Sequence, residues 1–174
     1  EGLRLRLGNA AGQSVDVTTL PAKLPDGSLV VTAVDHEAQE DARRLAWSGA
    51  QPATASLVTD KPMTLMRETN GEVMVVLTTR IEEAPQGEAT VGVTCGSGCK
   101  AVDLPAREAL AKLPTGQWTT FGVPLKCLSV AGADMRKLDS VLVLRSAGKL
   151  QLSVSRVALG ASNEAEHVLP CKVM

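Results

Sequence analysis

Aromatic side chains are scarce in this sequence of 174 residues, which has no Tyr, one Phe (Phe121) and two Trp (Trp47 and Trp118). Protein surfaces that bind sugars generally rely on flat aromatic faces, which bring a large contact area and a defined geometry. Three aromatic side chains are too few for an extended stacking surface. The composition therefore argues against a broad sugar-binding platform.

Other features are also missing. The sequence has only two His, and it contains no G-x-S-x-G, H-E-x-x-H or phosphate-loop motif. The 18 Lys and Arg balance the 19 Asp and Glu, so there is no basic surface of the kind that binds nucleic acid. No apolar run reaches membrane-spanning length. These absences point to no catalytic residue and predict neither a nucleic-acid partner nor a membrane partner.

Short runs of alternating polar and apolar residues dominate the chain, and segments rich in Gly, Pro and Asn separate them. This alternation is typical of strands with one buried face. Strands are predicted at residues 3–7, 14–20, 28–34, 43–47, 53–59, 72–81, 88–95, 117–125, 140–145 and 149–159. In the last of these the apolar phase shifts, and a bulge near Ser155 and Arg156 would keep both sets of apolar residues on the core face.

A single segment carries a helical pattern. Ala106, Ala109, Leu110 and Leu113 follow helical spacing, between a start marked by Asp103 and Pro105 and a stop marked by Pro114 and Gly116. A shorter turn is expected at 132–138, and residues 35–44 form either a helical turn or a loop. Many strands with one short helix predict an all-β fold, an antiparallel jelly-roll β-sandwich formed by the single domain 1–174.

The four cysteines allow several interpretations. Zinc sites usually have C-x2-C spacing, whereas Cys95 and Cys99 are separated by three residues. A redox pair would have C-x-x-C spacing at the start of a helix, whereas this pair follows a predicted strand. Disulfides fit better, because Gly96 and Gly98 allow a tight five-residue loop, and Cys127 would then pair with Cys171. Four free buried thiols remain the alternative. Two disulfides would imply an oxidising compartment, periplasmic or extracellular.

Two further sets of residues could bind ligands. The carboxylates of Asp35, Glu37, Glu40 and Asp41 form either a calcium site or a solvated loop, since Ca²⁺ prefers several oxygen ligands. Trp47 and Trp118 could contact a sugar, although their positions on strands favour a place in the core or at its edge.

Two stretches of the sequence resemble a known family. The segment from "VTCGSGCKAVDL" to "LQLSVSRVAL" and the upstream "QEDARRLAWSG" are similar to the C-terminal ExoP-type galactose-binding-like domain of bacterial glycoside hydrolase family 3 enzymes. The downstream similarity is carried by Cys95, Gly96, Cys99, Asp103, Leu104, Gly116, Trp118, Val123, Pro124, Leu125, Cys127, Gly132, Ala133 and Asp134. The upstream part is carried by Asp41, Ala42, Arg43, Trp47, Ser48 and Gly49.

The resemblance implies a galactose-binding-like β-sandwich that accompanies the catalytic domains of an exo-acting β-glucan glucohydrolase or β-glucosidase. It implies that the chain itself is not an enzyme and needs no cofactor, and that its partners are the catalytic domains of its own polypeptide. The start "EGLRLRLG", which is already strand-like, likewise predicts a fragment of a longer protein. The alternative is a free-standing carbohydrate-binding module that recognises β-glucan oligosaccharides.

Overall fold

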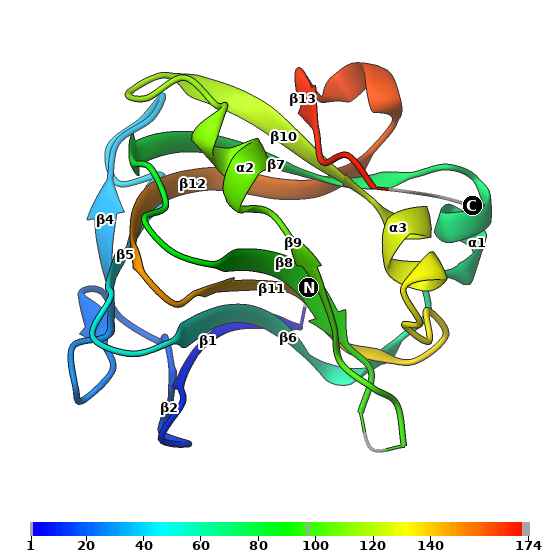
Figure 1. The fold of residues 1–174 in the computed structure, drawn as a ribbon, viewed down its shortest axis with the longest axis horizontal. Coiled ribbons are helices and arrows are strands. Elements are labelled where there is room, and N and C mark those ends of the chain that lie inside the picture. The colour runs from blue at the N-terminus through cyan, green and yellow to red at the C-terminus, as the bar shows by residue number, and fades with distance from the viewer. Residues whose placement is uncertain (1, 97, 172–174) are drawn as a thin grey trace.

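The computed structural model describes residues 2–96 and 98–171, which form two sheets packed face to face (Figure 1). The six-stranded sheet has the order β2 (Ser14–Asp16), β1 (Leu3–Asn9), β6 (Ala53–Met63), β11 (Leu138–Ser146), β8 (Ala89–Thr94) and β9 (Val102–Pro105). The seven-stranded sheet has the order β13 (His167–Val168), β10 (Trp118–Pro124), β7 (Met74–Glu83), β12 (Lys149–Gly160), β5 (Ala42–Ser48), β4 (Leu29–Val34) and β3 (Ala22–Lys23).

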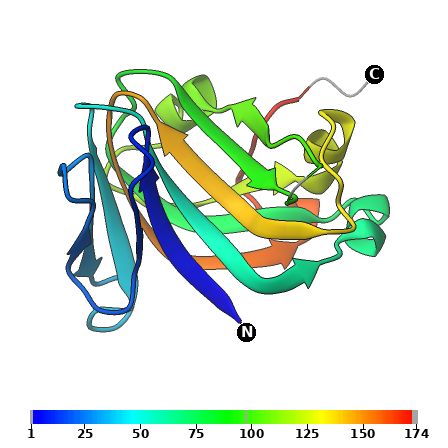
Figure 2. The ribbon, with the colours of Figure 1, turned by 90° about the horizontal axis from the view of Figure 1, so that it is seen from below.

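Neighbouring strands pair antiparallel, and the short strand β13 adds to β10 in parallel. Figure 2 shows the six-stranded sheet from below, with β1, β6, β11 and β8 crossing the view as one broad face. This architecture confirms the predicted antiparallel β-sandwich. Within the described ranges, no helix is long and apolar enough to cross a membrane.

The core between the sheets is aliphatic, as the scarcity of aromatic residues requires. Leu7 of β1 and Leu144 of β11 face Leu45 of β5 and Leu152 of β12, and all four are buried. Burying one Leu side chain contributes roughly 1.5–3 kcal/mol relative to exposing it, so many such side chains can replace a few large rings. The alternation seen in the sequence directs these residues inward.

The bulge in β12 lies where the apolar phase changes. Its pairing with β7 shifts register between Val154 and Arg156, so that Val154 and Val157 both remain against the core. The extra residue is Ser155, which confirms the predicted bulge and its position.

The predicted helix is α2 (Arg107–Ala111), which is shorter than its sequence pattern suggested. Two further short helices, α1 (Met66–Asn70) and α3 (Leu125–Val130), and a 3-10 turn, η1 (Ser162–Glu164), have no clear sequence signature. The predicted strand 117–125 ends one residue early, at Pro124, because the chain turns into the helix α3 at Leu125. The predicted strand 14–20 also ends early, at Asp16. The next residue, Val17, still donates its N–H to the carbonyl of Leu5 in β1.

All four cysteines form disulfides, Cys95 with Cys99 and Cys127 with Cys171. The Cα–Cα distances, 5.5 and 6.0 Å, lie in the usual range for disulfides. Gly96 and Gly98 have φ of 76° and 80°, the left-handed conformation that the short loop after β8 was expected to need. The prediction of two disulfides is therefore confirmed, and the interpretations as zinc ligands and as free thiols are not.

The second disulfide fastens the C-terminal segment. Cys127 lies in α3, whereas Cys171 follows β13, and Leu169 between them is buried and donates its N–H to the carbonyl of Gly122 at 2.8 Å. The tail is therefore held by a covalent bond, a buried side chain and backbone pairing.

Candidate functional site

The outer face of the seven-stranded sheet carries a polar cluster across four adjacent strands. The register places Trp118 of β10 opposite Arg80 of β7, Arg80 opposite Ser153 of β12, and Ser153 opposite Arg44 of β5. Directly opposite residues share one face of a sheet, so these side chains form a row. Together with Glu82 of β7 they are called the Glu82 cluster below.

The carboxylate of Glu82 is the centre of this cluster. It accepts hydrogen bonds from the Ser153 hydroxyl at 2.7 Å and from Arg80 Nε at 2.8 Å, and Arg44 Nη2 lies 3.5 Å away. Burial raises the pKa of Glu82, but the hydrogen bonds from Ser153 and Arg80 and the two guanidinium charges outweigh burial, so its pKa is lowered. Glu82 is therefore held as an anion that binds together β5, β7 and β12.

Trp118 is half-buried, and two neighbouring side chains lie against its ring system. The His36 ring is tilted by 37° with its centroid 4.0 Å away, and the guanidinium carbon of Arg80 lies 5.0 Å from the Trp118 ring. Both contacts are favourable for an aromatic side chain. They also occupy ring surface that a sugar would need for stacking.

His36 reaches Trp118 from the loop 35–41, and carboxylates set the shape of this loop. Asp41 accepts the backbone N–H groups of His36 at 2.6 Å and of Glu37 and Ala38 at 3.0 Å, while Asp35 accepts that of Glu40 at 2.6 Å. Burial raises the pKa of Asp41, but these backbone donors outweigh it and the pKa is lowered. The loop thus behaves like an Asx-type turn built around two aspartates.

This geometry corrects the calcium prediction. Within residues 2–96 and 98–171, no three Asp, Glu, His or Cys side chains gather closely enough to hold a metal ion, and this includes Asp35, Glu37, Glu40 and Asp41. The two aspartates direct their oxygens to backbone N–H groups, whereas the side chain of Glu37 points into solvent. The two aspartates organise the loop, and the four carboxylates do not converge on one point.

A polar pocket of about 770 Å³ is lined both by the loop 35–41 and by two arginines of the Glu82 cluster. The loop contributes Asp35, His36 and Glu40 to the lining, and the sheet contributes Arg44 and Arg80. Two buried nitrogens, Nδ1 of His36 and Nε of Arg44, have no hydrogen-bond partner within the described part of the protein. The side chains that line the pocket are mostly polar or charged, and the pocket is thus suited to binding through hydrogen bonds rather than through stacking.

Trp47 does not contribute to any binding surface, and its prediction as a sugar contact is corrected. Its side chain is 2% exposed and lies in the core between the sheets. Its indole N–H donates to the carbonyl of Ala53 at 2.9 Å, which connects β5 to the start of β6. Trp47 points inward because it shares the phase of Leu45, two residues earlier on β5.

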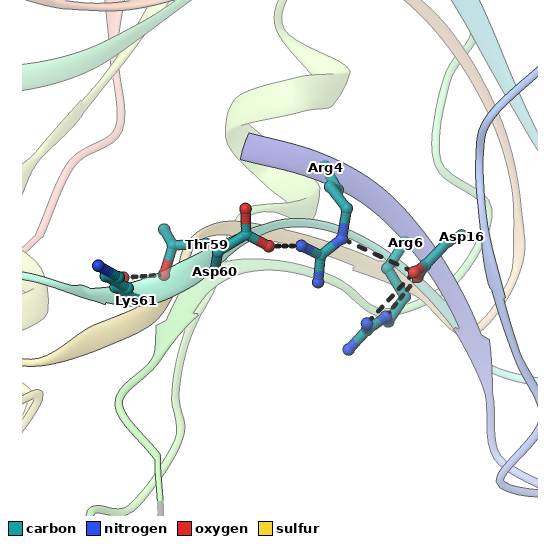
Figure 3. Close-up of polar contacts among 6 residues, drawn as sticks. All are labelled: Arg4, Arg6, Asp16, Thr59, Asp60 and Lys61. Carbon is teal, nitrogen blue, oxygen red and sulfur yellow. Dashed lines mark hydrogen bonds and ion pairs between the residues drawn. The ribbon is translucent and has the colours of Figure 1, made fainter. Parts of the chain in front are cut away.

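The outer face of the other sheet carries a second polar network, drawn in Figure 3. Arg4 of β1 lies between Asp16 of β2 and Asp60 of β6, and Arg6 of β1 donates to Asp16 at 2.6 Å. The hydrogen bond from Arg6 lowers the pKa of Asp16. This network ties together three strands at the edge of the sheet, and its paired charges indicate a structural role.

The family follows from a comparison with family models. The Exop_C model, described as "Galactose-binding domain-like", matches residues 4–159. The chain belongs to this family. The match covers strands of both sheets as far as Leu159, the last residue but one of β12, and includes every residue of the Glu82 cluster. No curated protein matches the chain.

Solved structures show the same fold for this Exop_C domain. The extra C-terminal domain of an exo-1,3/1,4-β-glucanase from a Pseudoalteromonas species matches with 24% identity and a TM-score of 0.77, over 99% of this chain and 94% of that one. The complete enzyme matches with a TM-score of 0.79 at 24% identity, and the present chain covers 21% of its length. A family 30 carbohydrate-binding module from Clostridium thermocellum matches with a TM-score of 0.65 at 14% identity, over 90% of this chain and 91% of the module.

The Exop_C domain thus brings together two of the sequence-predicted sets, Trp118 and the carboxylate-rich loop, and separates Trp47 from them. The sequence did not indicate Arg44, Arg80, Glu82 or Ser153 as a cluster. Their only signal was polar residues on the non-core phase of predicted strands, and that pattern is equally typical of an ordinary solvated face. Strand order and register make the cluster, and neither can be read from one sequence.

Proposed function

We propose that this Exop_C domain is a non-catalytic accessory domain of a secreted or periplasmic β-glucan hydrolase, with the catalytic region of the same polypeptide as its main partner. The observation that carries the proposal is the match over almost the whole length of the extra C-terminal domain of a β-glucanase. In that enzyme the domain accompanies a much larger chain, of which the present one covers 21%.

The carboxyl groups support a non-catalytic role. Glycosidases use a pair of carboxyl groups, and the general acid of the pair needs a raised pKa. Within the described ranges, the carboxyl groups with a clear shift all have lowered pKa values, namely those of Asp16, Asp26, Asp41, Glu82 and Asp134. Each accepts hydrogen bonds that hold it as an anion, which suits structural roles.

The disulfides support a compartment outside the cytosol. Both pairs of cysteines are bonded, and disulfides persist in oxidising surroundings such as the periplasm and the extracellular medium. A glucan hydrolase that meets polymeric substrate would work in the same surroundings.

A carbohydrate-binding module is the second candidate function. It is favoured by the similarity of the fold to a family 30 module and by the polar pocket beside Trp118. Against it stands the aromatic inventory, because Trp47 and Phe121 are buried and Trp118 is covered in part by His36 and Arg80. Without stacking, hydroxyl contacts mostly replace contacts with water and contribute little net affinity.

Calorimetric titration of the isolated chain with laminari- and cello-oligosaccharides separates the two functions. We expect dissociation constants in the millimolar range or weaker, and no hydrolysis of an aryl β-glucoside beyond that of a mock-purified control. A micromolar dissociation constant that is lost in Trp118→Ala, with the variant still folded by circular dichroism, would instead establish a carbohydrate-binding module. Phe121→Leu serves as the matched control, because Phe121 is buried in the core.

A further inference from the structure

An apolar cavity of about 310 Å³ lies between the two sheets. Leu5 of β1, Leu57 of β6 and Leu142 of β11 line it from the six-stranded sheet, and Leu45 of β5 and Leu77 of β7 line it from the other. The Glu82 cluster lies on the opposite, outer face of the seven-stranded sheet, so the two sites are separate.

The cavity follows from the composition of the core. Its lining consists mainly of Leu, Val and Ala with no aromatic side chain, and Ala55 of β6 lies on its wall. Two packed sheets stand about 10 Å apart, and side chains as short as Ala and Val leave part of that gap unfilled. The aliphatic part of this cavity is poorly suited to water, because Leu, Val and Ala side chains offer no hydrogen-bond partners.

The cavity reaches the surface where β5 begins and β12 bulges. β12 pairs with β5 only from Lys149 to Val154, so beyond the bulge it has lost this neighbour. Ser155, Arg156 and Asp41 line this end of the cavity. Leu159, two residues beyond Val157 on the same strand phase, is 46% exposed and extends the apolar surface outward.

Arg43 stands at this opening. It occupies the next inward-facing position on β5 after Trp47 and Leu45, a phase that is otherwise apolar, and it lines the cavity. It donates only to backbone carbonyls, those of Glu40 at 3.5 Å and Ala42 at 3.4 Å. Across residues 2–96 and 98–171, neither Arg43 nor Arg156 has an ion-pair partner. The nearby carboxylate of Asp41 is engaged by three backbone N–H groups.

We propose that this inter-sheet cavity is a binding site for a small amphiphilic carboxylate, with an aliphatic tail among the leucines and its anionic group at Arg43. The charge at the opening selects an anion, because a guanidinium pairs well with a carboxylate and has no such partner here within the described ranges. If each methylene takes the roughly 30 Å³ that a water molecule takes in the liquid, the cavity accommodates about ten carbon atoms. A medium-chain carboxylate such as decanoate matches both requirements, and this inference does not depend on the proposed accessory function.

The test uses the isolated chain and three probes with the same tail: decanoate, decan-1-ol and decyltrimethylammonium. The two ionic probes are kept below their micelle concentrations and decan-1-ol below its solubility limit. Calorimetry measures affinity, and methyl NMR spectra locate the site. We expect decanoate to bind most tightly, with shifts concentrated on the methyl groups of Leu5, Leu57 and Leu142. Arg43→Gln should weaken decanoate binding by roughly five- to tenfold and leave decanol binding unchanged, as loss of one charge-assisted contact requires. Arg145→Gln, the same change on β11 away from the cavity, should alter neither.

Substitutions that fill the cavity provide the second part of the test. Ala55→Leu should weaken both decanoate and decanol by at least tenfold, and Val157→Leu at the opening repeats the experiment if Ala55→Leu does not fold. Absence of binding, methyl shifts located elsewhere, or unchanged affinity in a folded filling variant would overturn the proposal. Equal affinity for decanoate and decyltrimethylammonium would overturn the assignment of Arg43 as the partner of the anion.

Discussion

The two disulfides close loops of very different length, and their removal should therefore have different consequences. Cys127 and Cys171 are separated by 44 positions, whereas Cys95 and Cys99 are separated by four. We consider the paired variants Cys127→Ser/Cys171→Ser and Cys95→Ser/Cys99→Ser, each of which removes one bridge and leaves the other. The two variants carry identical substitutions, so the loop length is the main difference between them.

The magnitudes follow from the entropy of the unfolded chain. A cross-link restricts the unfolded state by an amount that grows with the logarithm of loop length, which gives about 4 kcal/mol for the long loop and about 2 kcal/mol for the short one. The long loop contains β11 and β12, which are inner strands of the two sheets. Its bridge also holds the buried Leu169 in place. We therefore expect the long-loop variant to lose about twice the stability.

Urea unfolding measured by tryptophan fluorescence and by circular dichroism tests this expectation. With a slope of roughly 2 kcal/mol/M, the midpoint should fall by about 2 M in the Cys127/Cys171 variant and by about 1 M in the other. The wild-type protein unfolded in reducing buffer should lose about as much as both variants together. The reasoning is refuted if the Cys95/Cys99 variant loses as much stability as the Cys127/Cys171 variant, or more.

Two further variants test the cluster and the sheet. Glu82→Gln should lower the free energy of unfolding at pH 7 by about 1–3 kcal/mol, because two guanidinium groups and a buried hydroxyl lose their carboxylate partner. The control Glu37→Gln, at a solvent-exposed position, should lower the free energy of unfolding far less. The pKa of Glu82 is lowered on folding, so its contribution to stability is complete above the unfolded pKa of about 4.3 and is lost as the pH falls through the folded pKa. The stability difference between wild type and Glu82→Gln should therefore shrink on acidification. A difference that grows on acidification would contradict the electrostatic role. Gly92→Ala should lower the free energy of unfolding by about 3 kcal/mol or more, or prevent folding, because the new Cβ would overlap the backbone carbonyl of Val102. Gly8→Ala, whose new Cβ would lie 3.2 Å from its nearest atom, should lower it much less in the same urea titration.

The Glu82 cluster also illustrates how paired charges can be structural. Its glutamate lies on the outer face of a sheet at 16% exposure, between two arginines from different strands. A largely buried anion with three donors stabilises the relative position of those strands and fixes which residues stand beside Trp118. Binding by the adjacent pocket would therefore depend on a scaffold that is set before any ligand arrives.

The sequence by itself determined much of the fold. Alternation along β1, β5 and β11 specified which side chains face the core, because the period of a strand is two wherever it occurs. The phase change in β12 located the bulge at Ser155 for the same reason. The glycines around Cys95 and Cys99 indicated the short disulfide through local backbone geometry, and family motifs indicated the galactose-binding-like class.

Only the tertiary structure decided the sites. Trp47 and Trp118 were equivalent in the sequence, yet strand phase and sheet order place Trp47 in the core and Trp118 beside His36 and Arg80. The acidic loop could have held a cation, but its aspartates are engaged by backbone N–H groups whose directions depend on the folded loop. The cavity beside Arg43 arises from the distance between two sheets whose strands are far apart in the chain. Such contacts depend on register and packing across the sandwich, and a pattern read along one strand does not contain them.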